Sequence, residues 1–75
     1  MKILDQLNHI QLAGLATLIF LGIREKTDLA WQQSEWQFSD IPDEAIAHLD
    51  QMDLLDQMTA VKYIAQRVQE ILTQP

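Results

Sequence analysis

Apolar residues in the first third of the chain follow a helical period. At about 100° per residue, one broad arc of a helix running roughly from Ile3 to Arg24 holds most of them: Ile3, Leu4, Leu7, Ile10, Leu15, Leu18, Ile19 and Leu21. The opposite side carries Gln6, His9, Ala13, Ala16, Thr17, Phe20 and Arg24. A surface helix has an apolar stripe only about 100° wide or slightly wider. Because this arc is wider, we expect that one neighbouring helix does not cover it.

Residues 25–38 allow two interpretations. In the first, Thr27 and Asp28 cap a further helix that continues through Gln33, because threonine is a good N-cap and aspartate suits a first turn. In the second, the first helix passes through this segment without a break, since Leu29 keeps the phase of Leu18. Both interpretations stay open at the level of the sequence.

The following stretch, SEWQFSD, is expected to be a connector that contains large aromatic residues. Trp36 and Phe38 point the same way if this connector is extended. Together with Trp31 they have two interpretations: anchors of a protein interface, where tryptophan is enriched, or core residues that cover the end of a thin bundle.

Two further helices follow the connector. Ser39 or Asp40 is expected to cap a short helix from Pro42 to about Gln51, whose apolar positions are Ala45, Ile46, Leu49 and Met52. A change of phase predicts a bend near residues 50–53, after which Asp53 caps a third helix from Leu54 to Thr73. Its apolar residues have the 4-3 spacing of a heptad seam: Leu54, Met58, Val61, Ala65, Val68 and Leu72.

This pattern predicts an all-α fold in a single domain, residues 1–75. Two long helices and one short connecting helix are expected to form a helical hairpin, which assembles as a dimeric four-helix-type bundle. A chain of 75 residues buries a thin core, and small domains usually need disulfides, a metal or association. Because the chain has no cysteine, we expect association.

The charge balance constrains the partner. The chain has 11 acidic and 5 basic residues, a formal net charge of −6. Nucleic acids and anionic membrane surfaces attract clusters of Lys and Arg, so we expect a protein partner and no nucleic acid. Six acids form a predicted acidic face: Asp40, Asp43, Glu44, Asp50, Asp53 and Asp56. This face has two interpretations, a docking surface for a basic partner or helix caps with solvated carboxylates.

The uncharged stretch IQLAGLATLIFLGI, residues 10–23, raises the question of a membrane span. Its fourteen residues suit a buried helix, whereas a bilayer needs roughly 20. The N-terminus has Asp5 and no pattern typical of a secretory signal. We therefore expect a cytoplasmic protein and argue against a membrane span.

Catalytic and metal-binding patterns are weak. Glu44 and His48 share a helix face but have no evident third ligand, and the sequence contains no nucleophile elbow or phosphate loop. We expect no enzyme, cofactor or metal. The leading hypothesis is a helical interaction module, as a homodimer or a small subunit of a complex. The alternatives are an acidic regulatory or inhibitory protein and a membrane-associated small subunit. The expected partner contacts are Leu15, Leu18, Phe20, Trp31, Trp36 and Phe38.

Overall fold

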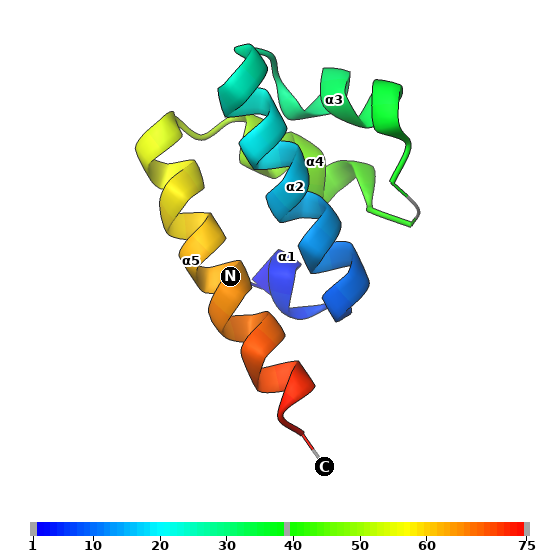
Figure 1. Ribbon diagram of the computed structural model, residues 1–75, viewed down its shortest axis with the longest axis vertical. Helices are drawn as coiled ribbons and strands as arrows, with labels where there is room; N and C mark the ends of the chain where they lie inside the picture. Colours follow the sequence, from blue (N-terminus) through cyan, green and yellow to red (C-terminus); the bar gives the residue numbers. More distant parts are fainter. Residues whose placement is uncertain (1, 39, 75) are drawn as a thin grey trace.

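The computed structural model describes residues 2–38 and 40–74, in which the regular secondary structure is entirely helical. In this described part of the chain five helices follow one another (Figure 1): α1 Lys2–Asp5, α2 His9–Glu25, α3 Leu29–Trp36, α4 Asp43–Asp50 and α5 Leu54–Leu72. The predicted all-α class is confirmed. The predicted count of three helices is wrong, because the first expected helix is divided and residues 29–36 form a helix of their own.

The first break lies at Asn8, inside the helix predicted from Ile3 to Arg24. The Asn8 side chain accepts a hydrogen bond from the Gln11 backbone N–H (2.8 Å), and the Gln11 side chain accepts one from the Asn8 N–H (2.9 Å). This reciprocal capping box starts α2 and separates it from α1. Ile10, expected on the apolar arc, is consequently exposed, whereas Leu4 and Leu7 reach the core from the short α1 and the turn after it.

The second break separates α2 from α3 and resolves the two interpretations of residues 25–38. Lys26 adopts the left-handed conformation (φ 57°), and the Thr27 N–H donates to the Gly22 carbonyl (3.0 Å). A Cβ on Gly22 would lie 2.9 Å from the Thr27 carbonyl oxygen, so any larger residue at this position would push the following turn away from the helix. Asp28 then caps α3 by accepting from the Trp31 N–H (2.7 Å). The capped continuation is confirmed.

Helix α3 extends three residues past its predicted end at Gln33, so Ser34 to Trp36 are helical and the connector predicted there is wrong. The Gln33 side chain donates to the Phe38 carbonyl (2.8 Å) and accepts from the Phe38 N–H (3.1 Å). These bonds satisfy the backbone just beyond the helix. The chain therefore turns sharply after α3 instead of running extended.

The starts of α4 and α5 use different caps. Pro42 occupies the N-cap position of α4 and makes no side-chain cap bond, so the predicted cap by Asp40 is wrong, and Ser39 lies outside the described residues. Asp40 instead has a left-handed backbone (φ 66°) in the turn before α4. Asp53 caps α5 as predicted, accepting from the Asp56 N–H (2.8 Å). The short helix, the bend near residues 50–53 and the third helix are confirmed to within two residues.

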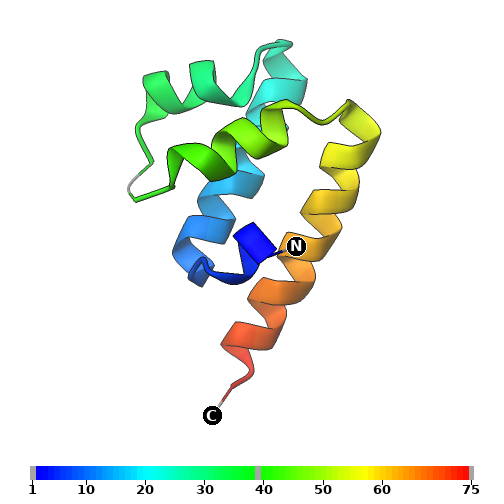
Figure 2. The same ribbon diagram turned by 180° about the vertical axis from the view of Figure 1, so that it is seen from behind.

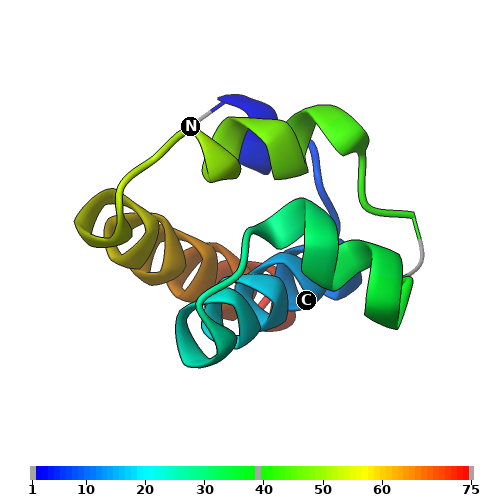
Figure 3. The same cartoon turned by 90° about the horizontal axis from the view of Figure 1, so that it is seen from above.

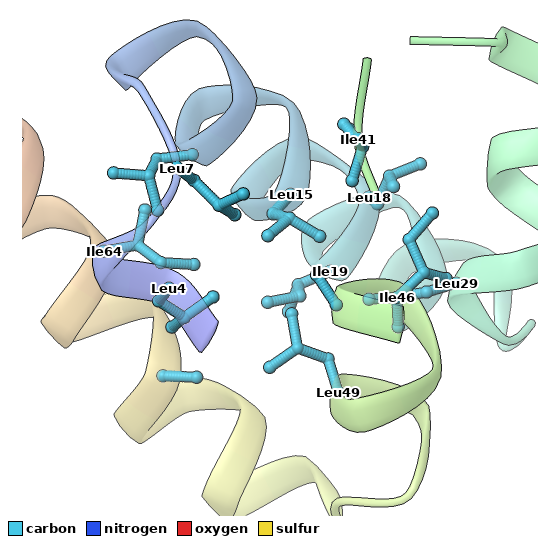
Figure 4. Packing of buried hydrophobic residues seen from close by; sticks show 13 residues of the cluster. Leu4, Leu7, Leu15, Leu18, Ile19, Leu29, Ile41, Ile46, Leu49 and Ile64 are labelled. Atoms are coloured by element: carbon cyan, nitrogen blue, oxygen red, sulfur yellow. The ribbon is translucent and has the colours of Figure 1, made fainter. Parts of the chain in front are cut away.

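The two long helices pack against each other, and the remaining elements complete the core on one of their sides. Helices α2 and α5 lie towards the viewer in Figure 1, and α1 and α4 cover their far side, as Figures 2 and 3 show. Helix α3 packs against α2 and α4. In Figure 4 apolar side chains from all five helices meet in one cluster. The radius of gyration is 11.6 Å, close to the roughly 11 Å expected for this length.

Candidate functional site

The heptad seam of α5 contacts the core only in part, through Val61 and Val68. The core-facing residues of α5 are Gln57, Ala60 and Ile64, whereas Leu54, Ala65 and Leu72 are exposed and the rest of the seam is half-buried. Helices α1, α2 and α4 determine which side of α5 is covered, and they leave an apolar stripe along its length.

This stripe forms one wall of a groove between α2 and α5, with a volume of about 580 Å³. The α2 wall consists of small residues and one aromatic residue: Ala13, Ala16, Thr17 and Phe20. The α5 wall carries seam residues together with their neighbours: Val61, Ile64, Ala65, Val68, Gln69, Leu72 and Thr73. The groove therefore joins the side of α2 opposite its buried arc to the seam of α5.

The polar groups of this groove are largely satisfied within the helices. The Thr17 hydroxyl donates to the Ala13 carbonyl (2.8 Å), and the Thr73 hydroxyl donates to the Gln69 carbonyl (3.0 Å). None of the lining residues is charged. Two large apolar side chains that line the groove are exposed to solvent: Phe20 is 50% exposed and Leu72 is 65% exposed. An exposed, continuous apolar patch of this kind is typical of an interaction surface.

The six predicted partner contacts lie in three different places. Leu15 and Leu18 have no exposed surface, so the core of the chain covers them and their expected role at a surface is wrong. Phe20 lines the groove. Trp31 and Trp36 lie on the exposed side of α3, and Phe38 is half-buried against the core.

The predicted acidic face is divided between capping and solvent. The Asp50 carboxylate accepts from the backbone N–H groups of Leu29 (2.7 Å) and Ala30 (3.1 Å), and so caps α3 from α4. Asp53 caps α5. The other four acids are exposed: Asp40, Asp43, Glu44 and Asp56. Capping therefore accounts for two members of the face.

A side-chain hydrogen bond joins the first helix to the last. The Tyr63 hydroxyl of α5 donates to the Asp5 carboxylate of α1. This hydrogen bond, with a smaller contribution from desolvation, raises the pKa of Tyr63 above its ordinary value of 10.0. The contact tethers α1 to α5 on the side of α5 away from the groove lining.

Apart from Phe20, the α2 residues that line the groove were not predicted as site residues, and neither were Glu25 and Glu35, which line a pocket with Trp31 and Trp36. Ala13, Ala16 and Thr17 had a signal in the sequence, since they form the small, uncharged side opposite the apolar arc. Glu35 is four residues from Trp31, which places both on one face of a helix. Glu25 joins them only because α3 folds back beside the end of α2.

Two kinds of site have no candidate in residues 2–38 and 40–74. No group of three or more His, Asp or Glu side chains is arranged to hold a metal ion. None of the helices combines the length and the apolar composition needed to cross a bilayer. Comparisons with protein-family models, curated proteins and solved structures give no match to this chain.

Proposed function

We propose that this chain is a non-enzymatic helical interaction module that forms a homodimer through the α2–α5 groove. The observation that carries the proposal is an uncharged groove continuous with a regular apolar seam on an otherwise acidic chain. A two-fold axis places the same patch of each copy against the other. The 4-3 spacing of the α5 seam lets two copies interdigitate.

The area of the surface formed by the α5 seam and the adjoining side of α2 supports a dimer of moderate affinity. The 19 residues of α5 span about 28 Å at about 1.5 Å per residue, and two adjacent helices are about 20 Å wide. The face therefore covers about 560 Å² per copy, or about 1,100 Å² in total, just above the roughly 1,000 Å² of a specific interface. Because the margin is small, we expect dissociation on dilution.

Charge favours a second copy over a basic partner at this surface. A partner attracted by the net charge of −6 would meet carboxylates, and the groove has none. Two copies of an acidic chain repel each other except where a charge-free face lets them approach. The groove meets that requirement.

The test compares two substitutions on adjacent residues of α5 that each add one negative charge. Ala65→Glu places a carboxylate in the groove, whereas Gln66→Glu places one outside its lining. Both residues are exposed in the monomer, so both variants should keep the helical circular dichroism of the wild type.

Sedimentation equilibrium over a wide concentration range gives the readout. Burying an unpaired carboxylate costs several kcal/mol, so Ala65→Glu should weaken the dimer by about 100-fold or more. Gln66→Glu should dimerise as the wild type does. A wild-type chain that stays monomeric at every concentration overturns the proposal, as does equal weakening by both substitutions.

A further inference from the structure

A second surface, outside the groove, combines two exposed indoles with two carboxylates. Trp31 and Trp36 of α3 are 46% and 58% exposed. They line a pocket of about 340 Å³ together with Glu35 of α3 and Glu25, the last residue of α2. This volume is at the lower end for ligand pockets, and it suits the head of one side chain.

The Trp36 ring is held by a chain of two partly buried hydrogen bonds. Its indole N–H donates to the Gln32 side-chain oxygen (3.1 Å), and the Gln32 amide donates to the Thr27 hydroxyl (2.8 Å). Gln32 has no exposed surface. Burying a side-chain amide costs free energy unless its polar atoms form hydrogen bonds. Here those bonds hold the polar edge of an exposed tryptophan, which fixes the ring before any ligand arrives.

The two carboxylates have no cation paired with them in the described residues. The ion pair found in residues 2–38 and 40–74 joins Arg67 to Glu70, on α5. Lys26 follows Glu25 directly, but it lies in the left-handed turn that ends α2 and makes no ion pair with either glutamate. The pocket therefore places two carboxylates beside two indole rings.

We propose that this pocket binds an alkylammonium cation, the head of a trimethylated lysine side chain on a protein partner. A cation over an indole face is attracted by the ring quadrupole, and tryptophan is the best of the aromatic residues for this contact. The methyl groups of trimethyllysine pack on the rings while Glu25 and Glu35 neutralise its charge. A phosphocholine head has the same cation but adds a phosphate, which the acidic surroundings repel.

The two tryptophans are the only ones in the sequence, so their indole N–H signals in NMR report on this pocket alone. The probes are trimethyllysine amide, choline, phosphocholine and 3,3-dimethylbutanol, the uncharged isostere of choline. We expect saturable shifts of both signals with trimethyllysine amide and choline, weaker binding of phosphocholine, and no saturable shift with the alcohol. Stronger binding of phosphocholine than of trimethyllysine amide would overturn the lysine assignment.

Charge variants test the carboxylates. Glu25→Gln and Glu35→Gln should each weaken binding by roughly two- to fivefold, as expected for exposed charge pairs. Glu44→Gln, an equivalent exposed change on α4, should have no effect. Equal saturation by the alcohol, or equal affinity of all three variants and the wild type, would overturn the proposal. Ala65→Glu should bind the cation unchanged, which separates this site from the proposed dimer.

Discussion

Asp50 is expected to stabilise the fold more than any other exposed or half-exposed acid, because it caps a helix that is distant in sequence. Its carboxylate accepts from the N–H groups of Leu29 and Ala30, 21 and 20 residues earlier. The Asp28 carboxylate accepts from the Trp31 N–H. The two carboxylates therefore bind three backbone N–H groups of the first turn of α3, which have no partner inside the helix. We predict that Asp50→Ala destabilises the protein strongly.

The magnitude follows from the two bonds that this change removes. A hydrogen bond to a charged group contributes about 1.5–3 kcal/mol, and an unsatisfied buried donor costs about 1–3 kcal/mol. The bond to Leu29 is partly buried, whereas the one to Ala30 is exposed and its N–H regains water. Asp50→Ala should therefore cost about 2–4 kcal/mol, out of roughly 4–11 kcal/mol for a chain of this length. Asp50→Asn keeps one acceptor oxygen and should cost about 1 kcal/mol.

Urea denaturation followed by circular dichroism measures these losses, at one fixed protein concentration because dimerisation would shift the midpoint. A loss of 3 kcal/mol corresponds to a fall in Tm of roughly 12–24 °C. Glu35→Gln, which removes one charge from the exposed side of α3, is the control and should stay within about 0.5 kcal/mol of the wild type. Asp50→Ala that is no less stable than this control would refute the capping role.

Three other predictions follow from the local geometry. Lys26→Gly should raise the free energy of unfolding by about 1 kcal/mol, because Lys26 has a left-handed backbone (φ 57°) that glycine adopts without strain; an unchanged or lower urea midpoint would contradict this. The hydrogen bond to Asp5 raises the pKa of Tyr63 above 10.0, so the stability that it contributes is complete below pH 10 and lost as the pH rises through the raised pKa. Thermal melting against pH should show this alkaline loss in the wild type and not in Tyr63→Phe. Leu18→Asp should unfold the chain since Leu18 is fully buried, whereas Val61→Asp, at a half-buried groove position, should keep the helical spectrum and lose dimerisation; identical behaviour of the two variants would contradict this distinction.

Local signals account for the parts of the fold that the sequence predicted well. The class, the short helix α4 and the bounds of α5 depend on helix-forming residues, caps and apolar spacing, which act over a few residues. The capping of α3 by Asp28 was one of two predicted alternatives. The cap at Asp28 favours a new helix, whereas the shared apolar phase of Leu18 and Leu29 favours an unbroken one, and neither local signal outweighs the other. The break at Asn8 was missed although Asn8 and Gln11 have the spacing of a capping box. The spacing of apolar residues alone does not reveal such a break in a helix.

The sequence by itself therefore determined where most helices begin and end, and that the chain carries more apolar helix surface than a thin core needs. Only the tertiary structure decided which surface is covered. Burial of a residue depends on neighbours that are distant in sequence: Ile64 lies in the core cluster, whereas Ala65, the next residue of the same helix, is exposed. For the same reason the carboxylate of Asp50 caps a helix 21 residues away, and Glu25 comes to lie beside the tryptophans of α3.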